Sequence, residues 1–159
     1  MAGSSVTVRD FGFDAVLAGL GDLSGRGVRV GFMGDAPHPN TPFNLPTLAA
    51  IHEEGEPSRK IPARPVIRPA ADANGPRIAD AGARQLAATL VESGAVDKML
   101  GRVGLAMQAE IKAGYVNAFE HVEPLKQATI DARLRRSVGS DHPLIDTGQL
   151  VNSVQWQVD

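Results

Sequence analysis

Apolar side chains in the second half of the chain recur in steps of three or four residues. This spacing places all of them on one face of a helix: Val96, Leu100, Val103, Met107, Ile111, Tyr115 and Ala118. The pattern predicts a long amphipathic helix over about 96–119. Three glycines interrupt it, Gly101, Gly104 and Gly114, and each costs up to about 1 kcal/mol relative to alanine. We therefore expect a neighbouring element to approach the helix backbone closely.

Weaker helical spacing and helix-end signals predict shorter helices elsewhere. Pro46 near the start and Gly55 at the end are typical of a short helix over 46–55. Apolar spacing predicts further helices over about 11–20, 77–91 and 125–136, and one helical turn before the C-terminal residues 154–158.

Strands are predicted near 28–33, 61–68 and 154–158. The first and last alternate apolar and polar side chains, as half-buried strands do. The middle one contains prolines, which favour an extended path at a sheet edge, and it would place Arg64 and Arg68 on one face. The fold class is therefore α+β, with a small mixed or antiparallel sheet packed against the long helix, plus shorter helices.

The length of 159 residues predicts one domain over 1–159. Its 17 glycines and 11 prolines gather at about 34–46 and 55–76, where we expect loops. The absence of cysteine excludes disulfides and thiolate sites. The net charge of -2 argues against a protein that binds nucleic acid through its overall field.

Segments that would cross or enter a membrane are not expected. The most apolar stretch, about 96–119, is interrupted by charged residues such as Asp97, Lys98 and Arg102, and the first 13 residues lack the apolar run of a signal peptide. We expect a soluble protein that is not exported.

Three local groups could carry chemistry. His52, Glu53 and Glu54 are metal-ligand types, and with the distant His38, His121 and Glu123 they leave open a small metal-dependent hydrolase; the alternative is a solvated helix end. Ser137, Ser140, Asp141 and His142 lie close together but lack a nucleophile elbow.

The third group is a basic cluster, Arg133, Arg135 and Arg136 with Lys126. Cations near a helix C-terminus are stabilised by the helix dipole, and a nucleic-acid contact is the alternative. Trp156, the single tryptophan, is expected in the core, with an oligomer interface as the alternative.

Three segments together resemble the minor tail and tail-completion proteins of tailed bacteriophages, the virion-morphogenesis group that includes the lambda protein Z type. They are a helix-end motif at 49–55 (Ala-Ala-Ile-His-Glu-Glu-Gly), a proline motif at 61–70 (Ile-Pro-Ala-Arg-Pro-Val-Ile-Arg-Pro-Ala) and a turn motif at 143–154 (Pro-Leu-Ile-Asp-Thr-Gly-Gln-Leu, then Asn-Ser-Val). Val66 stands where the family usually has an aromatic residue.

The resemblance implies a structural virion protein, made in the bacterial host cytoplasm, that completes the tail or joins it to the head at the neck. A tail terminator or head-closure protein is the alternative within that neck. The implied partners are copies of itself in a ring, neighbouring connector, terminator or tail-tube proteins, and viral double-stranded DNA that passes without sequence-specific binding. No catalysis, cofactor or metal is implied. We expect structural or partner-contact roles for residues of the proline and turn motifs: Arg64, Arg68, Asp146, Gln149 and Leu150.

Overall fold

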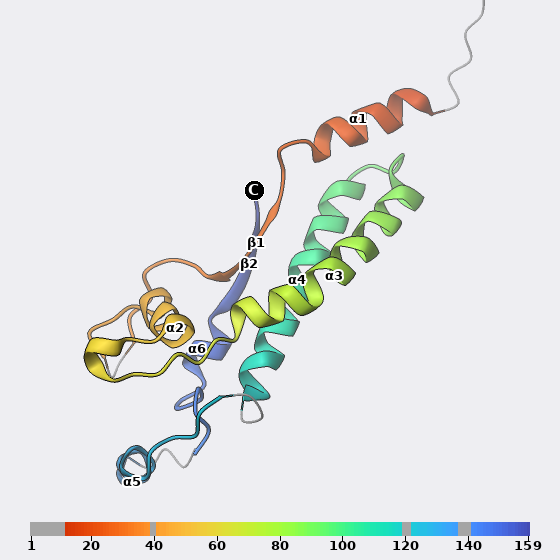
Figure 1. Cartoon of the computed structure of the whole chain (residues 1–159). Helices are drawn as coiled ribbons and strands as arrows, with labels where there is room; N and C mark the ends of the chain where they lie inside the picture. Colours follow the sequence, from red (N-terminus) through yellow and green to blue (C-terminus); the bar gives the residue numbers. More distant parts are fainter. Residues whose placement is uncertain (1–11, 39–40, 119–121, 137–140) are drawn as a thin grey trace, which may run out of the picture.

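Two long helices packed side by side and a small sheet organise the fold (Figure 1). The computed structural model describes residues 12–38, 41–118, 122–136 and 141–159. In chain order the elements are α1 (Phe13–Leu23), β1 (Val28–Phe32), α2 (Leu45–Glu54), the 3-10 turn η1 (Pro57–Arg59), α3 (Ile67–Thr89), α4 (Ala95–Val116), α5 (Gln127–Arg135), α6 (Gln149–Asn152) and β2 (Val154–Val158).

The sheet pairs the first strand of the chain with the last one. β1 and β2 pair antiparallel, with Val28 opposite Val158 and Phe32 opposite Val154. One face of this sheet packs against α4, and the other carries exposed polar side chains of Arg29, Gln155 and Gln157. The predicted α+β class, with a small sheet against one long helix, is confirmed, and the sheet is antiparallel.

The glycines of α4 lie where neighbouring side chains approach its backbone. A Cβ atom on Gly104 would lie 2.7 Å from two ring atoms of Trp156, and one on Gly114 would lie 2.9 Å from a methyl group of Val66. The expected close approach is therefore confirmed. Trp156 packs on the helix side of the sheet and is half-buried.

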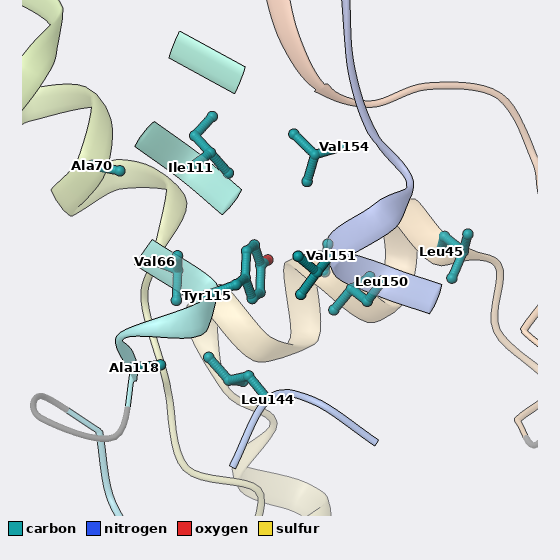
Figure 2. Close-up of a cluster of buried hydrophobic side chains, with 11 residues drawn as sticks. Leu45, Val66, Ala70, Ile111, Tyr115, Ala118, Leu144, Leu150, Val151 and Val154 are labelled. Carbon is teal, nitrogen blue, oxygen red and sulfur yellow. The ribbon is translucent and has the colours of Figure 1, made fainter. Parts of the chain in front are cut away.

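The apolar face of α4 supports two clusters of buried side chains. One gathers around Ile111 and Tyr115, and Figure 2 shows Tyr115 between Val66 on one side and Val151 on the other. The second contains Leu86 of α3 with Val96 and Leu100 of α4. Every member of the predicted stripe over 96–118 is buried or half-buried, so the periodicity identified this face correctly.

The predicted strand at 61–68 is wrong. Ile61 forms only an isolated bridge with Glu56, and α3 begins at Ile67. The Glu53 carboxylate accepts hydrogen bonds from the backbone N–H groups of Val66 and Ile67, so these groups cannot join a sheet ladder. The prolines at 62 and 65 offer no backbone donor either.

The predicted helix at 77–91 and the predicted loop at 55–76 are also corrected, because α3 runs through both prolines, Pro69 and Pro76. Pro69 lies in the first helical turn, where a backbone N–H has no partner within the helix. Pro76 removes one internal hydrogen bond, and packing of Ile78 and Leu86 compensates for this loss because both side chains are buried.

The remaining predicted elements are present with shifted ends. The predictions at 11–20, 46–55 and 125–136 correspond to α1, α2 and α5, and the single turn before β2 is α6. The long helix, expected to reach residue 119, ends at Val116, and residue 119 lies outside the described residues. No helix among the described residues is long and apolar enough to cross a membrane.

Candidate functional site

Glu53 connects the helix-end motif to the proline motif. One carboxylate oxygen accepts the N–H groups of Val66 (2.8 Å) and Ile67 (3.0 Å), and the other accepts that of Arg68 (2.8 Å). A negative charge is stabilised at a helix N-terminus, and hydrogen bonds to a carboxylate are strong ones. Glu53, at the end of α2, therefore fixes where α3 begins.

Gly55 allows the same two motifs to lie against each other. Its φ of 77° is in the left-handed region, and a Cβ atom there would lie 2.7 Å from the backbone nitrogen of Ala63. The N–H of Arg64 donates to the carbonyl oxygen of His52 at 2.7 Å. A side chain at position 55 would force the two segments apart.

Arg64 and Arg68 have different environments. Arg64 is 8% exposed, and its Nε donates to the carbonyl oxygen of Glu123 at 3.1 Å. Arg68 is exposed on the first turn of α3. The prediction that Arg64 and Arg68 share one face of a strand is wrong. The backbone changes from an extended path to a helix between the two residues.

The turn motif folds around Gly148, whose φ of 78° places it in the left-handed region just before α6. The N–H of Gln149 donates to the Thr147 hydroxyl at 3.4 Å, and the Gln149 side-chain amide donates to the carbonyl oxygen of Pro37 at 3.3 Å. Leu150 is 6% exposed and belongs to the cluster around Tyr115. The turn is thus tied to the segment that follows β1.

Asp146 lies between two arginines of the basic cluster. Its Oδ2 is 3.2 Å from Nη2 of Arg136, and its Oδ1 is 3.5 Å from Nε of Arg133. The second contact is an ion pair without hydrogen-bond geometry, because Oδ1 is buried with no hydrogen-bond partner among the described residues. Nη1 of Arg133 donates to the carbonyl oxygens of His142 (2.6 Å) and Ile145 (3.1 Å).

Arg133 is therefore a structural cation of the turn motif, and it is 8% exposed. Burial lowers the pKa of its guanidinium, while Asp146 opposes that shift. The helix dipole therefore explains the presence of Arg133 near the end of α5 only in part. Its side chain is buried and holds the backbone of residues 142–145.

His142 joins the turn motif to the end of α4. Its Nδ1 accepts the N–H of Leu144 at 3.3 Å, so the ring proton belongs on Nε2, which lies 2.9 Å from the carbonyl oxygen of Val116. Both ring nitrogens thus have backbone partners. Ser137 and Ser140, which lie near His142 in the sequence, are outside the described residues, as is His121 of the metal alternative.

His52 lies on the side of α2 that faces the turn motif. Its buried Nδ1 has no hydrogen-bond partner among the described residues. Burial lowers the pKa of its imidazole to about 4, with Arg64 and Arg133 acting in the same direction. His52 and Asp146 line a hollow of about 220 Å³ together with His38, Leu48, Arg133 and other side chains.

In the candidate metal site of His52, Glu53 and Glu54, the carboxylate of Glu53 is already occupied. It accepts hydrogen bonds from three backbone N–H groups. Within the described ranges, no three His, Cys, Asp or Glu side chains come together as metal ligands would. Glu54 is exposed at the end of α2.

The five residues expected to have structural or contact roles divide by burial. Arg64 and Leu150 are buried within the chain, which agrees with a structural role, and a partner contact for either stays a prediction. Asp146 and Gln149 are half-buried, and Arg68 is exposed. Sequence reasoning missed the cap formed by Glu53 and the inward turn of Arg133, since both depend on partners that are distant in the chain.

The three motifs thus form one structural cluster. The Glu53 cap and the hydrogen bond from Arg64 to His52 join the first two motifs, and Ala49, Val66 and Leu150, one from each motif, belong to the same buried cluster. Comparison of the chain with protein-family models, with curated proteins and with solved structures found no match.

Proposed function

We propose that the chain is a structural protein of a tailed-bacteriophage virion, which completes the tail or joins it to the head at the neck. The observation that supports this role is the spatial cluster of the three motifs that carry the resemblance. The helix-end and turn motifs are about 90 residues apart, yet residues of both line one hollow.

In this role the protein acts through surfaces that contact copies of itself around the tail axis and the neighbouring connector, terminator or tail-tube proteins. Arg68 is the member of the candidate set that is available to a partner, because it is exposed where the others are not. The net charge of -2 gives viral DNA little attraction to the protein as it passes.

Inactivation of the gene in the phage that encodes it tests the role and its alternatives. Normal-length tails and DNA-filled heads that remain unjoined, seen by electron microscopy, would support tail completion. Tails of uncontrolled length would indicate a tail terminator, and heads that lose their DNA would indicate a head-closure protein. Normally joined particles would rule out a neck role.

A substitution at Arg68 tests the proposed contact surface. We expect Arg68→Ala to leave the purified chain folded, by circular dichroism, and to reduce the fraction of joined particles. Arg84→Ala is the matched control, because Arg84 is another exposed arginine of α3 outside the three motifs. Equal titres for the two variants would remove Arg68 from the interface. Arg64→Ala is unsuitable, since its buried side chain also supports the fold.

A further inference from the structure

α5 is set apart from the rest of the fold. Figure 1 shows it away from the sheet and from the α3–α4 pair, and within the described chain it packs closely against no other helix or strand. Neither of the two apolar clusters of the described residues contains one of its side chains. Leu134 of α5 is 59% exposed. Apolar packing therefore contributes little to holding this helix in place.

α5 is also too short to be stable by itself. It has nine residues, and isolated helices shorter than about 12 to 15 residues are marginal in water. Lys126, which precedes it, provides no side-chain cap, so the first backbone N–H groups of the helix gain no stabilisation from that position. The helix therefore depends on contacts made by individual side chains.

Arg133 joins α5 to the turn motif. It is the one buried residue of α5, whose residues are all described, and its Nη1 donates to the carbonyl oxygens of His142 and Ile145. Asp146 faces both Nε of Arg133 (3.5 Å) and Nη2 of Arg136 (3.2 Å), the residue that follows the helix. Charged and polar contacts thus connect α5 to the turn.

The turn motif is anchored to the rest of the fold by other residues. Leu144 and Leu150 belong to the apolar cluster around Tyr115, and Nε2 of His142 lies 2.9 Å from the carbonyl oxygen of Val116 in α4. These contacts do not involve α5. The turn can therefore stay in place when α5 leaves it.

We propose that Asp146, Arg133 and Arg136 form an ionic latch that holds α5 on the turn motif, and that α5 unfolds as a separate unit when the latch opens. Segments with few buried apolar contacts open at a lower free energy than the core. The helical state of α5 is then conditional on the Asp146 carboxylate. The latch is a property of the purified chain and does not rest on the proposed virion role.

Hydrogen exchange of the wild type at increasing, sub-denaturing urea concentrations tests whether α5 is a separate unit. The amides of α4 should exchange through global unfolding, so their exchange should accelerate steeply with urea. The amides of 130–135 should exchange faster and nearly independently of urea, because opening α5 alone exposes little surface. Equal urea dependence in α4 and α5 would overturn the proposal.

Asp146→Asn tests the latch itself. The substitution removes the carboxylate charge at almost constant size, and a buried cation that loses its counter-ion is strongly destabilised. We expect exchange in 130–135 to accelerate at least about tenfold, while exchange in α4 changes less than about twofold. Equal acceleration in α4 and α5 would mean that Asp146 supports the whole fold, and it would overturn the proposal.

Asp131→Asn is the matched control. Asp131 is exposed on α5, and its carboxylate accepts the side-chain amide of Gln127 in the same helix at 2.9 Å. The substitution removes the same charge without touching the latch, and loss of one such pair should accelerate exchange in 130–135 by no more than about twofold. Equal effects of Asp131→Asn and Asp146→Asn would overturn the proposal.

Arg136→Gln weakens the latch from its exposed side. Because the Arg136 side chain is exposed, this variant should fold like wild type, and it should accelerate exchange in 130–135 by about two- to fivefold. Unchanged exchange in 130–135 would contradict the latch.

Discussion

At the scale of single residues, Glu53 joins two helices that follow each other in the chain, α2 and α3. It satisfies three backbone N–H groups at the start of α3, 13 to 15 residues further along the chain. The first N–H groups of a helix have no partner within the helix. The carboxylate thus replaces the local side-chain cap that α3 lacks at Val66.

Glu53→Gln should lower the free energy of unfolding by about 1 to 2 kcal/mol. The amide has one acceptor oxygen and no charge, so it cannot satisfy all three donors. Urea denaturation followed by circular dichroism measures the change. Glu54→Gln is the control, because this neighbouring side chain is exposed and should change stability by less than about 0.5 kcal/mol. Equal losses in both variants would contradict the capping role.

His52 should make the protein less stable in mild acid. The folded imidazole resists protonation down to a pKa of about 4, while the unfolded one binds a proton near pH 6.5. Acidification through this window therefore favours the unfolded state, by at most about 3 kcal/mol. The contribution is fully present above pH 6.5 and lost towards pH 4.

The measurement is urea denaturation at a series of pH values for wild type and His52→Gln. Carboxylates titrate in the same range in both proteins, so the difference between the two curves isolates His52. We expect the variant to lose less stability than wild type between pH 6.5 and 4. Parallel curves would show that the imidazole is accessible to protons in the folded state.

At the scale of elements, the packing of β2 on α4 depends on the absence of a side chain at Gly104. A Cβ atom there would lie 2.7 Å from the Trp156 ring, but one on Gly101 would lie 3.5 Å from it, which is ordinary contact. The two glycines occupy the same helix and face the same ring. They therefore separate the steric effect from helix propensity.

Gly104→Ala should destabilise the protein by about 1 to 3 kcal/mol, because the ring and the helix must move apart. Gly101→Ala should be neutral, or stabilising by up to about 1 kcal/mol, because alanine favours helix. Thermal denaturation of both variants measures the contrast. A stabilising Gly104→Ala would mean that the ring moves away without cost.

Elements whose signals are local were predictable from the sequence. The periodicity of α4 and the Pro46 and Gly55 signals of α2 identified those helices, with ends shifted by a few residues. The segment 61–68 was not predictable, because spaced prolines suit both an extended strand and the first turn of a helix. The decisive partner, Glu53, lies outside that segment.

The packing of the three motifs against one another was not predicted from the sequence. The partner-contact role of Arg68 stays a prediction, and its side chain is exposed. Spacing could not show that Arg64 is buried against the carbonyl of Glu123, or that Arg133 turns inward to His142. Both contacts depend on where the chain returns after α4.

At the scale of the whole molecule, the small negative charge predicts weak interaction with DNA. Sixteen basic and 18 acidic side chains give a net charge of -2, and two arginines of the basic cluster are paired with Asp146. Non-specific binding depends on how many phosphates a protein neutralises. The chain as a whole has no excess of positive charge with which to bind them.

We therefore expect no measurable binding of a labelled 30-base-pair duplex at 50 mM salt and micromolar protein, in fluorescence anisotropy. A protein that lets DNA pass should show this behaviour. Tight binding that weakens steeply as salt rises would contradict it and would favour the nucleic-acid alternative for Arg135 and Arg136.

The position of Trp156 gives the molecule a built-in optical reporter. It is the single tryptophan of the chain, and its ring contacts Gly104 of α4 from β2, the last strand. Its emission spectrum will shift to longer wavelength when the ring becomes solvated. Release of the C-terminal strand can therefore be followed separately from melting of the helices, without attaching a label.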